Sequence, residues 1–228
     1  MKYQLSIIIP VLNEAYIINQ TLRHLQNMDF DGTVEIIVVD GDPKGSTVNA
    51  ITSADVKKAV ASKGRGAQMN KGAVLAAGDI LLFLHADVTL AMDAFKQIVD
   101  TCNRKNLAGG AFSFGINSKR KAFKIIEIAV AVRSHLTKIP YGDQAIFLKT
   151  KYFHQIGKFR EIPLMEDVEM MRRIKQTGGR IVILPSKVLT SPRRWEKEGV
   201  VYCTLRNWLL ITLYLFGASP ERLVKFYR

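Results

Sequence analysis

The stretch Ile80-Leu81-Leu82-Phe83-Leu84-His85-Ala86-Asp87 decides the fold of this chain. Five apolar residues run without a break after Gly78, which is typical of a strand buried on both faces of a parallel sheet. Ligands of open α/β sheets bind beyond the carboxyl ends of the strands, so His85 and Asp87 stand where a binding site is expected. A histidine and an aspartate at that place are capable of holding a metal.

The residues around this strand, from 1 to about 103, alternate between strand and helix patterns with short connections. That alternation predicts an α/β fold with a mostly parallel sheet and right-handed crossovers. The predicted strands cover residues 5–10, 34–40, 56–61 and 80–84. One predicted helix begins near residue 13, and two others cover residues 66–77 and 91–102.

The second half of the chain is less regular. It predicts strands over 109–116, 145–148 and 180–184, the last closed by Pro185, and helices over 121–136 and 166–177. No repeat or linker interrupts the 228 residues, so a single domain over 1–228 is the simplest interpretation.

A nearly continuous apolar segment runs from Trp208 to Ala218. A bilayer span needs roughly 20 apolar residues, so this segment is too short to cross. A core helix is the favoured interpretation. The alternative is a helix on an anionic membrane surface, because arginines and aromatic residues flank the segment.

Cysteine usage and the start of the chain bear on location. Cys102 and Cys203 lie far apart without metal-binding spacing, which predicts reduced thiols and a cytoplasmic setting. Residues 5–12 lead into Asn13-Glu14 without a small-residue cleavage pattern, so no signal peptide is expected.

The formal net charge of +13 is concentrated, since residues 118–160 hold ten Lys or Arg against two acids. Such a surface attracts phosphates of nucleotides, nucleic acid or lipid headgroups, or it is simply a solvated face. A purely non-enzymatic binder of membranes or nucleic acid would account for the charge but would leave Asp40, Asp87 and Asp167 unexplained.

Acidic residues follow three predicted strands, at Asn13-Glu14, Asp40 to Asp42 and His85 to Asp87. Any one of them alone is best read as a turn or helix-capping residue. Because the strand ends of a parallel sheet share one edge, the three together predict clustered carboxylates that need a cation or ligand. Hard oxygen ligands suit Mg²⁺ or Mn²⁺.

Two further patterns precede helices. Gly64-Arg65-Gly66 can bring backbone and guanidinium close to a phosphate, although the motif alone is weakly specific. Glu166-Asp167 follows Pro163; acids there favour the helix dipole, and one of them can also act as a general base for a hydroxyl group.

As a set, these motifs resemble inverting family 2 glycosyltransferases with the GT-A fold. The matching pieces lie in order over roughly residues 4 to 185, and the likeness is closest to small bacterial members with a Gly-Asp-Gln-Ala-Ile-Phe signature. They are Ser6 to Glu14, Ile37 to Asp42 with Ser46-Thr47, Gly64 to Gly72, Leu84 to Asp87, Gly142 to Ala145 and Glu166-Asp167.

The resemblance implies a role for each matching residue. Asp87 would hold the divalent cation, Mn²⁺ or Mg²⁺, on the donor diphosphate, and Asp167 would be the catalytic base with Glu166 in support. The nucleotide-sugar site would include Pro10, Asn13, Glu14, Asp40, Asp42, Arg65, Asn70, His85, Ala86, Asp143 and Gln144. Asp40 would face the base, and Asp143 and Gln144 the donor sugar or acceptor.

Two positions depart from the family pattern. His85 stands where an aspartate is usual; neutral imidazole suits Mn²⁺ but adds no charge to hold Mg²⁺, so its part in the metal site is the weaker expectation. Gly41 replaces a second aspartate, with Asp42 following it, which puts the contacts to ribose or base in doubt.

The expected function is therefore the metal-assisted transfer of a hexosyl group from a UDP-linked sugar to a hydroxyl group. The acceptor would be a small or lipid-linked molecule, and no nucleic acid is expected as a partner. Residues 1–103 would form the nucleotide-binding half, 104–190 the acceptor and catalytic half, and 191–228 a helical segment that contacts the inner face of an anionic membrane. The alternative enzyme is a sugar-nucleotide pyrophosphorylase, which would need a glycine-rich basic loop after the first strand, where this chain has Pro10 to Asn13.

Overall fold

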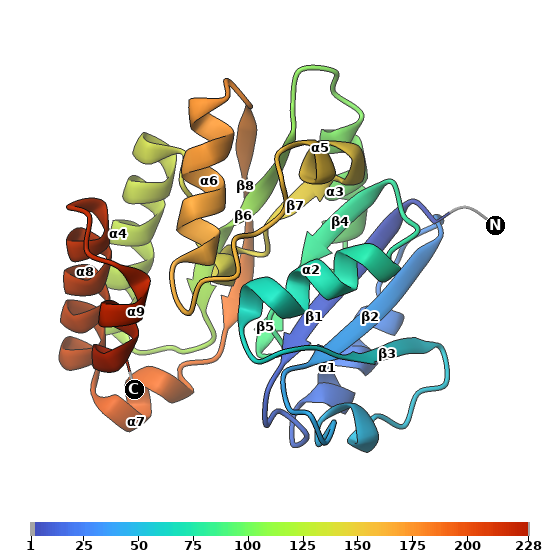
Figure 1. Cartoon of the computed structure of the whole chain (residues 1–228), viewed down its shortest axis with the longest axis horizontal. Coiled ribbons are helices and arrows are strands. Elements are labelled where there is room, and N and C mark those ends of the chain that lie inside the picture. Colours follow the sequence, from blue (N-terminus) through green and yellow to red (C-terminus); the bar gives the residue numbers. More distant parts are fainter. Residues whose placement is uncertain (1–2, 228) are drawn as a thin grey trace.

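The computed structural model describes residues 3–227, which build one eight-stranded sheet with helices on both faces (Figure 1). The strand order is β3-β2-β1-β4-β7-β6-β8-β5. The strands are β1 (Leu5–Val11), β2 (Val34–Asp40), β3 (Val56–Val60), β4 (Ile80–Phe83), β5 (Val88–Thr89), β6 (Gly109–Ile116), β7 (Phe147–Lys149) and β8 (Ile181–Thr190). The α-helices are α1 (Ile18–Gln26), α2 (Arg65–Leu75), α3 (Ala94–Cys102), α4 (Lys121–Thr137), α5 (Thr150–Gln155), α6 (Glu166–Gln176), α7 (Arg193–Glu198), α8 (Val200–Leu215) and α9 (Pro220–Leu223).

The amino-terminal half forms the parallel part of the sheet. β1 pairs with β2 on one side and β4 on the other, both parallel, and β3 extends the row beyond β2. Along β1, Ile7 and Ile9 enter the core cluster that includes α1 and α3, whereas Ile8 enters the cluster on the face covered by α2 and α6. Burial on both faces explains why these strands are continuous apolar runs.

The carboxyl-terminal half adds strands of both directions. β7 is antiparallel to β4 and to β6, and β8 is parallel to β6. The two-residue β5 then pairs antiparallel with the far end of β8. This chain of pairings brings the residues after β8 alongside the strand ends of the first half.

Pro185 does not end the last strand as the sequence predicted. β8 runs through it to Thr190, and the register with β6 shifts at that point, from Phe112 opposite Leu184 to Ser113 opposite Lys187. A bulge accommodates a proline because the residues that it inserts need not donate to the ladder.

The apolar carboxyl-terminal segment is not a core helix, contrary to the favoured interpretation. It belongs to α8, of which only Cys203 and Leu210 are buried. Within residues 3–227 no helix is both long and apolar enough to cross a membrane. An apolar helix that is mostly exposed therefore needs another explanation.

Candidate active site

The carboxyl ends of β1, β2 and β4 lie together, as the parallel pairing requires. The Val11 carbonyl at the end of β1 accepts hydrogen bonds from the Gly41 N–H (2.8 Å) and from the side-chain amide of Gln68 (2.7 Å). The same amide donates to the carbonyl of Val39 (2.8 Å), and the N–H of Leu84 donates to Ile8 (3.0 Å). Gln68 of α2 thereby ties two strand ends to the helix that begins at Arg65.

Asp40 turns inward at this edge. Its carboxylate is fully buried and accepts the N–H groups of Asp42 (2.9 Å), Thr47 (2.7 Å) and Val48 (3.2 Å). The Thr47 hydroxyl in turn accepts the N–H of Glu14 (3.1 Å). Instead of facing a nucleotide base, as the sequence predicted, Asp40 shapes the loop after β2 and fastens it to the loop after β1.

Glu14 and Asp87 meet beyond the ends of β1 and β4. Burial raises the pKa of each carboxyl group, and the charge of Asp87 raises the pKa of Glu14 further. Glu14 Oε2 is buried and makes no hydrogen bond in the structure. Two desolvated carboxylates in electrostatic range of each other favour a bound cation.

Arg193 is a member of the site that the sequence did not single out. It follows β8, and its guanidinium lies 3.9 Å from Glu14 Oε2 and 4.7 Å from the ring centre of Tyr16. The pairing of β8 with β5 carries it there from more than 170 residues away in sequence. Among the residue patterns, only the arginine pair before Trp195 could have pointed to it.

Asp167 is held in place by the loop before β7. Its Oδ2 accepts the N–H of Gly142 at 2.6 Å, and its Oδ1 accepts the N–H of Val168 at 2.7 Å. A Cβ on Gly142 would come within 3.1 Å of His85 Nε2 and 3.3 Å of Asp167 Oδ2, so a larger residue would push these side chains by a few tenths of an ångström. The contact also places Asp167 beside the residues that follow β4.

Several titratable groups around Asp167 are strongly perturbed. Burial raises the pKa of Glu166 to about 7, with a further contribution from the adjacent Asp167, and burial raises that of Asp143 to about 6. Burial and the nearby charge of Arg65 lower the pKa of His85 to about 3, so its imidazole is neutral. Perturbed groups that gather at strand ends are typical of functional sites.

Arg65 is the cation that these carboxyl groups share. Burial opposes its charge, but the fields of Tyr227, Glu166 and Asp167 more than compensate and raise its pKa. It also acts on Glu14, Asp87 and Asp143. The side chain remains in contact with solvent, so it is free to contact an anionic ligand.

Gln144 lies in the core, behind the residues that surround Asp167. It is fully buried; its Oε1 accepts hydrogen bonds from Arg133 (3.1 Å) and Ser134 (2.9 Å), and its Nε2 donates to Phe112 (2.9 Å). This departs from the expected contact with donor or acceptor, because every hydrogen bond of its amide goes to the protein. Gln144 anchors the loop that holds Asp167.

Arg133 and Tyr141 form a second unexpected feature beside this loop. The guanidinium of Arg133, on α4, stacks on the Tyr141 ring, with 3.2 Å between Cζ and the ring centre. Arg133 Nε and Asp143 Oδ1 are buried without hydrogen bonds within the described chain. Buried polar atoms normally have a hydrogen-bond partner, so these two atoms near Asp167 call for one that water or a ligand would supply.

The remaining predicted residues divide into two groups. Pro10, Asn13, Asp42 and Ala86 lie at the strand ends; Asn13 adopts a left-handed backbone (φ 59°), and the carbonyl of Ala86 accepts the Thr21 hydroxyl. Asn70 instead makes two hydrogen bonds to the backbone of Phe159. Its Nδ2 donates to the Phe159 carbonyl (2.9 Å), and its Oδ1 accepts the Phe159 N–H (3.0 Å). Asn70 therefore fixes a neighbouring loop, which is a correction to its expected place in the nucleotide site.

No three His, Cys, Asp or Glu side chains in residues 3–227 are arranged to hold a metal by themselves. Asp87 and Glu14 supply hard oxygens, and neutral His85 supplies a nitrogen donor at the same edge. The hard oxygens of these two acids suit a divalent cation that would take most of its ligands from a bound phosphate.

The model of the glycosyl transferase family 2 matches residues 6–162, well over half of the chain; the match includes Glu14, Arg65 and Asp87 and ends before Asp167. The chain belongs to this family. The transferase is 26% identical to the probable glycosyltransferase YdaM of Bacillus subtilis (strain 168), in an alignment covering 86% of this chain and 51% of the relative. The chain thus spans about half the length of that curated relative.

Solved structures share the fold of the transferase. It is similar to the mannosyltransferase PcManGT from Pyrobaculum calidifontis in complex with GDP-Man and Mn²⁺, with a TM-score of 0.65, 22% identity, and 83% and 57% of the two chains covered. S. aureus TarS 1-349 gives a TM-score of 0.60 at 15% identity, covering 98% and 69%. These likenesses confirm the expected GT-A fold.

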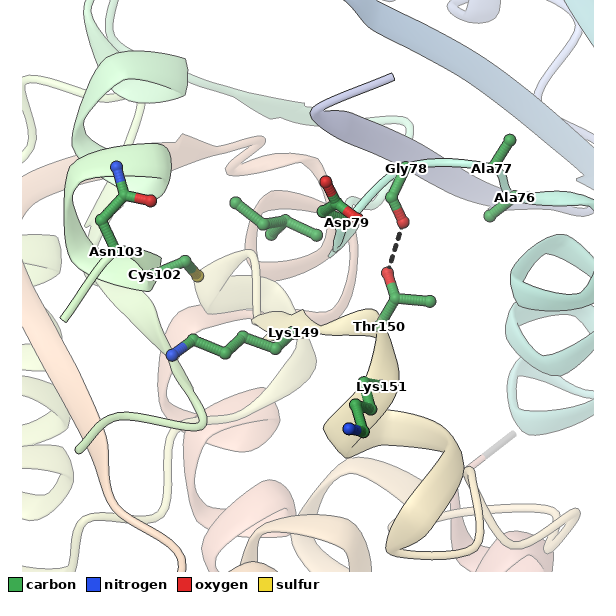
Figure 2. A pocket seen from close by; sticks show the side chains of 10 residues that line it. Ala76, Ala77, Gly78, Asp79, Cys102, Asn103, Lys149, Thr150 and Lys151 are labelled. Atoms are coloured by element: carbon green, nitrogen blue, oxygen red, sulfur yellow. Dashed lines mark hydrogen bonds between the residues drawn. The ribbon is translucent and has the colours of Figure 1, made fainter. Parts of the chain in front are cut away.

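Two cavities lie near β4 of the transferase. One, of about 540 Å³, is at the amino end of the strand, where the Thr150 hydroxyl donates to the Gly78 carbonyl at 2.6 Å and Cys102 and Lys149 line the wall (Figure 2). A smaller recess of about 130 Å³ reaches Asp87 from the side of α1. The larger cavity is thus at the opposite end of the strand from the site.

The buried carboxyl group of Glu166 makes stability depend on pH. Its pKa is about 7 in the folded transferase against 4.5 when unperturbed, so between these values the folded state holds more protons than the unfolded one. The free energy of unfolding should therefore fall as pH rises from 4.5 to 7, by about 3 kcal/mol from this group. Urea titrations across this range should show a flatter profile for Glu166→Gln.

The matched control for that measurement is Glu196→Gln, which changes an exposed carboxyl group on α7. Its profile should follow that of the unsubstituted protein. Equal flattening by both substitutions would contradict the assignment to Glu166.

Proposed function

We propose that this glycosyltransferase moves a hexosyl group from a UDP-sugar to a hydroxyl acceptor with inversion at the anomeric carbon. The observation that carries the proposal is the placement of Asp167, fixed by Gly142 at 2.6 Å, beside the edge where Asp87, Glu14 and Arg65 gather. A base and an anion-binding edge side by side are what a single displacement on a nucleotide sugar needs.

The reaction forms one bond and breaks one. The acceptor oxygen attacks the anomeric carbon from the face opposite the nucleotide, the carbon–oxygen bond to the diphosphate breaks, and the diphosphate leaves with the electron pair. Asp167 takes the proton of the acceptor hydroxyl, which raises the nucleophilicity of the oxygen. The Gly142 N–H orients the carboxylate toward this task.

The leaving diphosphate would lie against Asp87, Arg65 and Arg193. Bound at Asp87, Mn²⁺ or Mg²⁺ would neutralise the charge that develops on the diphosphate. Arg65 and Arg193 carry positive charge to the same place from α2 and from the end of β8. Guanidinium groups suit this position because they bind phosphate oxygens in pairs.

The acceptor side would be built from the other half of the chain. Arg133, Tyr141 and Asp143 lie in electrostatic range of Asp167, and two of them carry unpaired buried polar atoms. We assign them to the acceptor hydroxyl and its neighbours, on a small or lipid-linked molecule. Glu166, with its raised pKa, would hydrogen-bond to the acceptor or sugar as a neutral carboxyl group.

A thermal-shift panel of nucleotide sugars with and without Mn²⁺ tests the proposal directly. A ligand at a hundred times its Kd stabilises the folded state by about 2.7 kcal/mol, which raises Tm by roughly 5–10 °C in a chain of this size. UDP-sugars with Mn²⁺ should give the largest shift, and free UDP an intermediate one. A shift confined to GDP-sugars would overturn the choice of nucleotide, and no shift with any nucleotide sugar would overturn the function.

A further inference from the structure

Exposed apolar side chains gather on two helices of this molecule. Of the nineteen large hydrophobic residues exposed in the described chain, eleven belong to α4 and α8, although these helices hold only 33 residues, and a twelfth follows α8 directly. On α4 they are Ile125, Ile128, Val132 and Leu136; on α8 they are Val201, Tyr202, Leu205, Trp208, Leu209, Leu213 and Leu215, and Phe216 comes next. We call this set the α4–α8 face.

The two helices lie together at one flank of the molecule, beyond β6 and β8 (Figure 1). Ile126 and Val130 of α4 pack with Trp195 and with Val200, at the start of α8, around the buried Phe123. The inner side chains are thus used for packing, while Leu136 and Phe216 are 78% and 88% exposed. Apolar stripes of this extent mark an interaction surface and are more than scattered surface residues.

The charges beside the α4–α8 face are mostly positive. Lys119, Arg120, Lys121 and Lys124 are exposed at the start of α4, and Arg222 and Lys225 are exposed after α8, where Glu221 is the one exposed acid of α9. The only acid of α4, Glu127, is buried and pairs with Lys124 and Lys187, and α8 contains no acid. The surface is therefore apolar in its middle and cationic at its ends.

We propose that the α4–α8 face docks on an anionic lipid bilayer, with both helices in the plane of the interface. Apolar residues enter the headgroup region while lysines and arginines bind lipid phosphates, the pattern of interfacial helices. Trp208 and Tyr202, exposed on α8, are the residue types that favour this depth. At about 24 Å each, the helices are long enough to lie flat but not to act as spans.

A second copy of the chain fits this surface less well. A two-fold interface on this face would bring the cationic ends of the two copies together, and no exposed acid on either helix would offset the repulsion. The bilayer offers the opposite charge. The inference is independent of the proposed chemistry, since it uses neither Asp167 nor Asp87.

Sedimentation with vesicles tests the inference. The full chain should sediment with vesicles of phosphatidylcholine and phosphatidylglycerol, less at high salt, and weakly with phosphatidylcholine alone. The double variant Trp208→Ser with Leu136→Ser should lower the partition coefficient at least tenfold without lowering Tm, because both side chains are exposed. Its matched control is Val74→Ser with Met92→Ser, two exposed apolar positions elsewhere.

Charge-reversal variants measure the electrostatic contribution to vesicle binding. Lys119→Glu with Lys121→Glu should lower retention on anionic vesicles, while Lys96→Glu with Lys105→Glu, on and after α3, should leave it near the unsubstituted value. Equal losses in test and control pairs would overturn the inference. So would a dimer in sedimentation velocity that the Trp208 and Leu136 substitutions disperse, because a second copy would then occupy the face.

Discussion

Asp167→Asn is expected to abolish sugar transfer while leaving donor binding intact. Asparagine has the same shape, and its oxygen can still accept the Gly142 N–H that holds the native carboxylate at 2.6 Å. It has no basic oxygen to take the acceptor proton, so kcat should fall by about 10²–10⁴-fold. Single-turnover transfer assays measure the loss, and thermal shift with the donor measures binding.

The matched control for this substitution is Asp100→Asn, on the exposed side of α3. It should leave kcat unchanged. Transfer by Asp167→Asn near the level of this control would show that another group takes the proton, and Glu166 and Asp143 would be the next carboxyls to replace.

Asp87→Ala is expected to remove the dependence of donor binding on Mn²⁺. Removing a residue that only hydrogen-bonds to a metal ligand typically lowers metal affinity by about 10–100-fold. Removing Asp87, which would bind the metal itself, should therefore weaken metal-dependent donor binding by about 100-fold or more. At a donor concentration that gives a shift of 5–10 °C in the native protein, the shift should then shrink to about 1 °C.

The same substitution should not destabilise the protein without ligand. Burial raises the pKa of Asp87, which means that the folded state penalises its charge. Asp87→Ala should therefore keep or slightly raise the ligand-free Tm, and Asp87→Asn should behave in the same way. A large fall in the ligand-free Tm, or donor binding that is equally strong without any metal, would contradict the assignment.

The sequence predicted the sheet well where burial alone determines the strands. β1, β2 and β4 are apolar runs because both of their faces are covered, and their ends therefore meet at one edge. β8 escaped prediction beyond Pro185 because its second half exists only through pairing with β6. Local propensity carries no information about such a distant partner.

The candidate site, too, could be predicted from the sequence only in part. The strand pattern predicted that Glu14, Asp40 and Asp87 share one edge of the sheet, and the family resemblance added Asp167. Neither could show that Asp40, Asn70 and Gln144 turn inward. Their amide and carboxylate groups suit buried hydrogen bonding as well as ligand binding, and only the surrounding N–H and C=O groups decide between the two. Arg193 was missed because β8 and β5 place it there.

Both ends of the sheet are ill suited to recruit a further strand. β3 presents exposed Lys57 and Lys58 in its middle, and β5 is two residues long, too short to template a partner. Charged side chains and short outer strands are the devices by which proteins resist edge-to-edge aggregation. At high local concentration, molecules of this kind should therefore stay dispersed and not polymerise into ribbons.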